Sequence, residues 1–127
     1  MRSYDVAVTS LVISAPTKWT DNLLSQYPIR DVLTERRGVA RRIGHQALIR
    51  IALIRQLHIQ LGMGVANGVS IAAQLLDSAS PGVYESGQLT LTIDLEELER
   101  SVGERLIDVL ESAPSPRRGR PPRTSTT

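Results

Sequence analysis

The chain has 127 residues, enough for one domain with a tail, and 41% of them are hydrophobic. It contains no cysteine, which excludes a disulfide framework and a thiolate metal site. Only one Trp and three Tyr supply aromatic rings, so we expect a core of Leu, Ile, Val and Ala. The formal net charge of +2 divides unevenly, with +5 in residues 1–76, −7 in residues 77–112 and +4 in residues 113–127. Nearly all the positive charge is arginine, which suits bidentate contacts with phosphate, so the two basic ends predict a polyanionic partner.

Two short helices are predicted near the N-terminus. Residues 5–13 are largely apolar, and residues 14–17 supply a turn in which Pro16 suits the first position of a new helix. That helix covers residues 17–27, with Trp19 on its apolar face, and Pro28 ends it. A helix-turn-helix needs such a pair, although many helical domains that bind no nucleic acid contain one as well.

The next segment, residues 29–43, is predicted to form a β-hairpin that turns at Gly38. It contains only two acids, Asp31 and Glu35. Its five arginines are Arg30, Arg36, Arg37, Arg41 and Arg42. An arginine-tipped hairpin after a helix-turn-helix is the layout of a wing, whose tip contacts a phosphate backbone or enters a minor groove. A solvated loop is the alternative interpretation.

The rest of the folded chain is predicted to form two helices, a hairpin and a last helix. Helices are predicted over residues 45–62, which Gly62 ends, and over residues 64–77, followed by a loop at 78–82. Residues 88–93 indicate a strand that pairs with 83–85, and Asp94 with Glu97 forms a capping box for a last helix. The apolar stripe of that helix would pack on the core or on a second copy. We therefore divide the chain into residues 1–76, a hairpin plus helix in 77–112, and a basic tail in 113–127 that cannot form a core.

Catalytic chemistry is not indicated. The glycine-containing stretch at 62–68 follows a helix instead of the strand that a dinucleotide-binding loop needs. His45 and His58 are too few to ligate a catalytic zinc ion, and no nucleophile motif stands out. We expect neither an enzyme nor a cofactor.

Residues 41–72 resemble the segment that follows the wing in MerR-type winged-helix regulators. The resemblance rests on Arg41-Arg42-Ile43, on a helix of spaced Leu and Ile, and on Gly62-Met63, while residues 14–24 are similar to the family's turn and recognition helix. It implies an α+β, mainly helical fold, namely a winged helix-turn-helix with a short β-hairpin and a C-terminal helix. The outward positions of the recognition helix, which would face the major groove, are Lys18, Thr20, Asp21 and Asn22. The wing residues that would hold the DNA backbone are Arg36, Arg37, Arg41 and Arg42.

The chain also departs from that family. Thr20-Asp21-Asn22 stands where the family often has an Arg and two Tyr, so base preference cannot be transferred. A hairpin and one short helix replace the family's long dimerising helix and effector domain, and the sequence does not identify a small-molecule effector.

The tail contains Arg-Gly-Arg-Pro, which resembles the core of an AT-hook. Gly119 would let the backbone approach the floor of an A·T minor groove, and the arginines would extend along it: Arg117, Arg118, Arg120 and Arg123. A chance match in an Arg/Pro-rich tail is the alternative.

Together these patterns predict a cytoplasmic, nucleoid-associated transcriptional regulator that binds double-stranded, A·T-rich DNA as a homodimer, with no membrane partner. Residues 77–112 would supply the dimerisation or partner surface. One alternative is an architectural DNA-binding protein without a dedicated operator. Another is an antitoxin-like interaction module whose acidic segment binds a basic protein.

Overall fold

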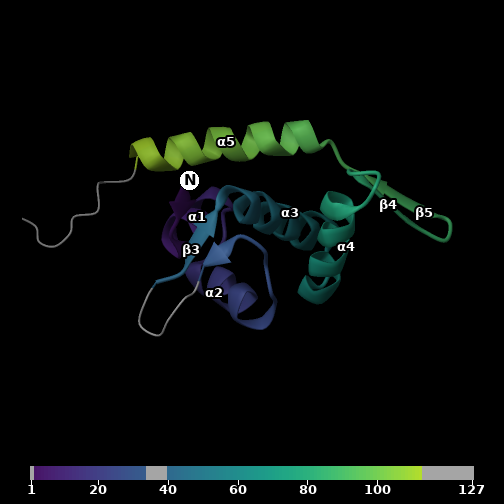
Figure 1. The fold of residues 1–127 in the computed structure, drawn as a ribbon, viewed down its shortest axis with the longest axis horizontal. Helices are drawn as coiled ribbons and strands as arrows, with labels where there is room; N and C mark the ends of the chain where they lie inside the picture. Colours follow the sequence, from purple (N-terminus) through teal and green to yellow (C-terminus); the bar gives the residue numbers. More distant parts are fainter. Residues whose placement is uncertain (1, 34–39, 113–127) are drawn as a thin grey trace, which may run out of the picture.

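A computed structural model of the chain describes residues 2–33 and 40–112 (Figure 1). Its elements are β1 (Ser3–Tyr4), α1 (Val6–Val12), α2 (Thr17–Gln26), β2 (Val32–Leu33), β3 (Arg42–Gly44), α3 (His45–Leu61), α4 (Val65–Asp77), β4 (Val83–Ser86), β5 (Leu89–Thr92) and α5 (Leu95–Ser112). The fold is α+β and mostly helical with antiparallel sheets, which confirms the expected class. Its assignment to the winged helix-turn-helix type stays a prediction.

A small three-stranded sheet in the order β1-β3-β2 joins the N-terminus to the predicted hairpin. Val32 of β2 and Tyr4 of β1 both pair with Ile43, which is fully buried. The two strands of the hairpin are therefore confirmed, while its turn at Gly38 lies outside the described residues. Sequence periodicity missed β1, because two residues are too few to show an alternation.

The long helix α3 forms the centre of the molecule. It is apolar on most of its circumference, and its buried residues are Ala47, Leu48, Ile49, Ile51, Ala52, Leu53, Ile54 and Leu57. Helices α4 and α5 and strand β3 all contact this helix and cover its apolar surface. Each fully buried Leu or Ile contributes about 1.5–3 kcal/mol to folding, and this helix holds more of the buried hydrophobic residues than any other element.

The N-terminus of α3 is capped by Asp31, a residue outside this helix and 15 positions from Gln46 in the sequence. Asp31 adopts a left-handed φ of 70°, and its Oδ2 accepts a hydrogen bond of 3.1 Å from the backbone N–H of Gln46. The carbonyl of Asp31 also accepts one of 2.8 Å from the N–H of Gly44. A Cβ at Gly44 would overlap the Asp31 carboxylate, so this position requires glycine.

The second half of the described chain confirms the predicted hairpin and last helix. In β4–β5, Tyr84 pairs with Leu91, and the hairpin extends away from the body at the end opposite α1 (Figure 1). Oδ1 of Asp94 accepts a 3.0 Å hydrogen bond from the backbone N–H of Glu97, as the capping motif predicts. Helix α5 then crosses both α3 and α1. Its buried seam consists of Leu98, Val102 and Leu106.

Candidate nucleic-acid interface

The turn between α1 and α2 has a defined geometry. Ser14 has a left-handed φ of 57°, its N–H donates to the carbonyl of Leu11, and the N–H of Ala15 donates to the carbonyl of Ser10. These two bonds and the left-handed residue make a Schellman motif, in which glycine is more usual than serine. The turn therefore stops α1 and starts α2 within a few residues, as a helix-turn-helix requires.

A buried hydrogen bond joins the two helices. The Ser10 hydroxyl donates to Oγ1 of Thr20 over 2.7 Å, and Thr20 is fully buried. The prediction that Thr20 faces the major groove is therefore wrong. Threonine is of intermediate polarity, so its place in a short helix does not indicate whether its side chain faces the core or the solvent. Here the hydrogen bond with the Ser10 hydroxyl holds the Thr20 side chain in the interior.

The other predicted positions of α2 lie on its outer face. Lys18, Asp21 and Asn22 are exposed, whereas Trp19 points toward α3, where its ring stacks at 6.0 Å on that of His58. The guanidinium of Arg55 lies 4.9 Å from the Trp19 ring, a cation–π distance. The opposite face of α2 is thus fixed to α3, and the polar face is left to solvent.

Arg41 connects the hairpin to this outer face. Its Nη1 donates to Oδ1 of Asp21 over 3.2 Å, and its Nη2 donates to the hydroxyl of Ser25 over the same distance. The side chain of Arg41 is only 26% exposed, and that of Asp21 is 52% exposed. A guanidinium has five N–H donors, so Arg41 can hold α2 in place and still donate to an incoming anion.

Arg42 turns to the other side of β3. Its Nε donates to the Ser3 hydroxyl over 3.1 Å and its Nη2 to the Ser3 carbonyl over 2.7 Å, which ties it to β1. Arg42 therefore braces the sheet and keeps its remaining donors exposed. Neither bracing role was apparent from the sequence, because Ser3, Asp21 and Ser25 lie 16 to 39 residues away from these arginines.

The remaining predicted contacts cannot be placed. Arg36, Arg37, Arg117, Arg118, Gly119, Arg120 and Arg123 lie outside the described residues. What the structure brings together is one surface formed by Lys18, Asp21 and Asn22 of α2 and by Arg41, with Arg42 on the adjoining strand.

Metal ligation, the role of His58 and membrane spanning can be assessed in the described part of the chain. No group of three or more His, Asp or Glu side chains there could hold a metal ion. His58 is structural, since its Nδ1 lies 2.8 Å from the carbonyl of Met63 and its ring stacks on Trp19. None of the described helices is both long and apolar enough to cross a membrane.

Comparison of the chain with models of protein families, with curated proteins and with solved structures gives no match.

Proposed function

We propose that the chain is a sequence-specific, DNA-binding transcriptional regulator of winged helix-turn-helix type. The observation that carries this proposal is the attachment of Arg41 to both Asp21 and Ser25, which joins the hairpin and the outer face of α2 into one polar surface. In this arrangement α2 enters the major groove, where Lys18 and Asn22 contact base edges or phosphates. The hairpin then follows the adjacent backbone.

Charge on this surface supports the proposal. Lys18 and Arg41 lie on it, Arg42 is exposed on the adjoining strand, and Arg2 and Arg30 are exposed elsewhere in the N-terminal half. Asp21 is the acid on the outer face of α2, and Arg41 neutralises it. A phosphate backbone therefore meets a net positive surface, to which the tail would add minor-groove contacts.

A homodimer suits this function, and an apolar patch supports it. Leu11 of α1 is 60% exposed, and Ile107 and Leu110 of α5 are 55% and 45% exposed. A shallow hollow lined by Leu11 and by Asp108, Val109 and Ser112 of α5 places the two helices side by side. Burying such side chains against a second copy is favourable, and two copies would read a palindromic site.

Selection of bound sequences from random DNA tests the proposal, run at two salt concentrations on the full chain and on a chain truncated after Ser112. A single enriched palindrome supports a regulator. Enrichment of A·T-rich DNA without a motif supports the architectural alternative. No binding to any DNA at low salt overturns the proposal and favours a protein-interaction module.

A further inference from the structure

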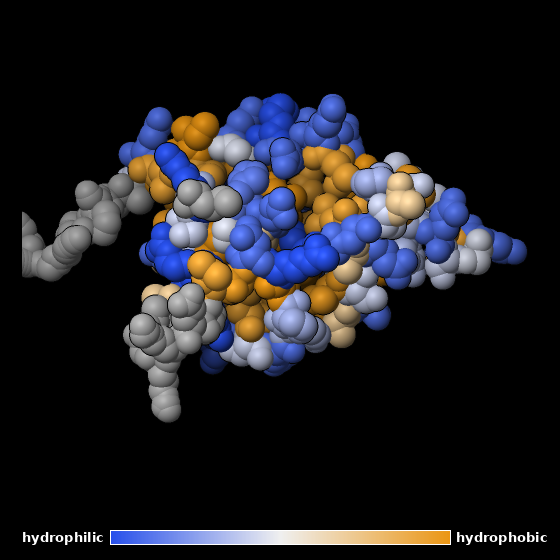
Figure 2. Space-filling view, in the orientation of Figure 1, coloured by the Kyte–Doolittle hydropathy of each residue, from blue (hydrophilic) through white to orange (hydrophobic). Residues whose placement is uncertain are grey.

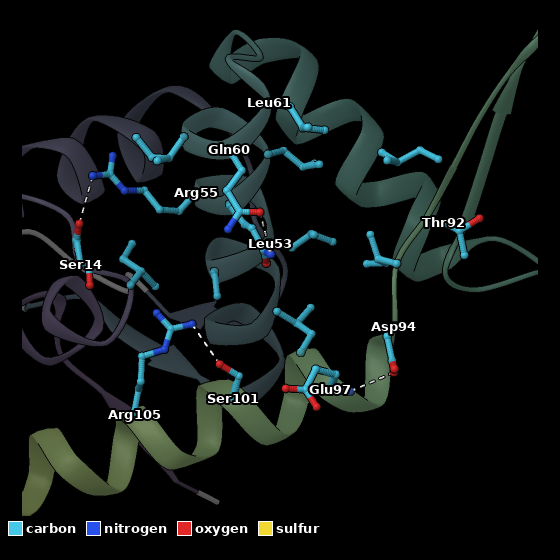
Figure 3. A pocket seen from close by; sticks show the side chains of 18 residues that line it. Ser14, Leu53, Arg55, Gln60, Leu61, Thr92, Asp94, Glu97, Ser101 and Arg105 are labelled. Atoms are coloured by element: carbon cyan, nitrogen blue, oxygen red, sulfur yellow. Dashed lines mark hydrogen bonds between the residues drawn. The ribbon is translucent and has the colours of Figure 1, made fainter.

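A groove of about 720 Å³ lies between α3, β5 and α5 (Figure 3). Figure 2 shows hydrophobic surface between α5 and the rest of the body on this face. Its apolar lining comes mainly from Leu53, Leu57, Ile59, Leu61, Leu91 and Leu98. Ile59 and Leu61 are 58% and 57% exposed, so this apolar surface remains in contact with water.

Two arginine side chains lie at one end of this groove. Nη2 of Arg55, from α3, donates to the carbonyl of Ser14 over 3.0 Å. Nη1 of Arg105, from α5, donates to the carbonyl of Val12 over 3.1 Å. The two side chains thus converge on one short turn from different helices, and both line the groove (Figure 3). Among the described residues neither has a carboxylate partner, although each guanidinium has donors to spare.

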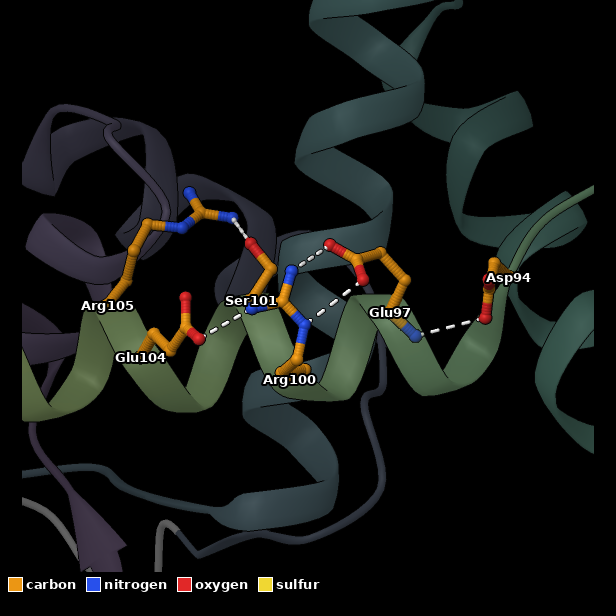
Figure 4. Close-up of polar contacts among 6 residues, drawn as sticks. All are labelled: Asp94, Glu97, Arg100, Ser101, Glu104 and Arg105. Carbon is orange, nitrogen blue, oxygen red and sulfur yellow. Dashed lines mark hydrogen bonds and ion pairs between the residues drawn. The ribbon is translucent and has the colours of Figure 1, made fainter.

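The acids at the opposite end are already engaged. Asp94 caps α5, and the carboxylate of Glu97 pairs with Arg100, which also pairs with Glu104 (Figure 4). The groove therefore presents a cationic end, an apolar length and a far end whose negative charge is partly neutralised.

We propose that this groove binds a free single-chain amphiphilic carboxylate, such as a medium-chain fatty acid. The carboxylate would lie on Arg55 and Arg105, where charge-assisted hydrogen bonds are strong, and the alkyl chain would extend toward Leu91 and Leu61. The volume falls within the range of small-molecule sites, about 300–1,000 Å³. A membrane surface is a poor source of this ligand, because the adjoining segment 77–112 carries a net charge of −7 and anionic lipid headgroups would be repelled.

Displacement of the fluorescent anion 1-anilinonaphthalene-8-sulfonate from the full chain tests this site without any DNA. We expect dodecanoate, below its micellar concentration, to displace the dye, and dodecyltrimethylammonium, which has the same chain but a positive head, to displace it far less. Arg105→Gln should weaken dodecanoate binding about tenfold. Arg30→Gln, the same change at an exposed arginine outside the groove, should leave it unchanged.

A second pair of variants tests the apolar part. Ile59→Glu places a carboxylate in the groove at an exposed position and should abolish dodecanoate binding, whereas Leu33→Glu, at a similarly exposed position on β2, should not. Circular dichroism melting confirms that both variants fold. Equal displacement by the cationic amphiphile, or unchanged binding in Arg105→Gln, overturns the proposal. Dodecanoate binding that appears only in Ile59→Glu, together with a change from dimer to monomer in that variant, also overturns it. The natural occupant of the groove would then be a second copy of the chain.

Discussion

The Ser10 hydroxyl donates a hydrogen bond of 2.7 Å to the Thr20 hydroxyl, and both side chains are buried where α1 packs on α2. This bond contributes, with the buried Leu23 and the stacking of Trp19 on His58, to the rotation of α2 about its own axis. With Thr20 held inward, Lys18, Asp21 and Asn22 face outward. The surface proposed to bind DNA is thus defined by a contact on the opposite face of the helix.

Ser10→Ala should lower the free energy of unfolding by about 1–3 kcal/mol, because it leaves the buried Thr20 hydroxyl without a partner. The double variant Ser10→Ala/Thr20→Val removes both hydroxyls and should recover most of that loss. Urea unfolding followed by circular dichroism measures both effects. Additive losses in the double variant would show that the hydrogen bond is not what couples these positions.

Gly44→Ala should destabilise the chain by about 1–2 kcal/mol, since the new Cβ displaces the Asp31 carboxylate from the N-terminus of α3 and removes that cap. Gly64→Ala is the matched control: Gly64 also precedes a helix, and a Cβ there has no atom within 4 Å. Thermal melting compares the two variants. Equal losses would mean that helix-capping preference, and not the contact with Asp31, sets the cost.

The pair formed by Arg50 and Asp77 predicts a pH dependence of stability. Nη2 of Arg50 donates to Oδ1 of Asp77 over 2.8 Å, and this hydrogen bond holds the pKa of Asp77 below its ordinary 3.8. Because the folded pKa is the lower one, the stabilisation is fully present above pH 3.8 and declines as the pH falls through the folded value.

Asp77→Asn should therefore cost about 1 kcal/mol or less at pH 7, since the Asp77 side chain is 38% exposed and solvent screens the pair. The difference between the variant and the original chain should shrink as the pH falls below 3.8 toward 2. Urea unfolding at a series of pH values measures it. A penalty that stays constant down to pH 2 would contradict the assignment.

Local signals were enough to predict most of the elements, whereas the contacts between them were not apparent. Asp94 and Glu97 predicted the start of α5 because a capping box is complete within four residues. Asp31, by contrast, caps α3 from 15 residues away, and Arg41 reaches Asp21 across 20 residues. Such pairings depend on the packed fold. The same limit explains Thr20, which the resemblance to MerR-type regulators placed outside and a hydroxyl on another helix holds inside.

The groove could not be predicted from the sequence either. Arg55 and Arg105 are 50 positions apart, and no spacing rule links them. Only the packing of α5 across α3 and α1 brings both guanidinium groups to the same turn.

Lys18→Gln should weaken DNA binding and reduce the slope of log K against log salt concentration by about 0.9, the value for one phosphate contact. Fluorescence anisotropy with a labelled duplex, measured at several salt concentrations, gives this slope. Arg100→Gln is the control, because it removes the same charge from α5, away from the proposed surface. Equal slopes for Lys18→Gln and the original chain would exclude Lys18 as a phosphate contact.

Dodecanoate should lower DNA affinity, provided that both proposals hold. Arg55 donates to Ser14 in the turn before α2 and lies against Trp19 within α2, so a carboxylate that draws its guanidinium into the groove loosens two of the contacts that hold that helix. Couplings of this kind usually amount to about 5–150-fold in affinity, and reciprocity requires DNA to weaken dodecanoate binding by the same factor. Anisotropy titrations with and without dodecanoate, and dye displacement with and without the duplex, measure the two factors.

Ile59→Glu should remove the effect of dodecanoate on DNA affinity while leaving DNA affinity in the absence of ligand unchanged. A loss of DNA affinity that persists in Ile59→Glu would show that dodecanoate acts elsewhere on the chain.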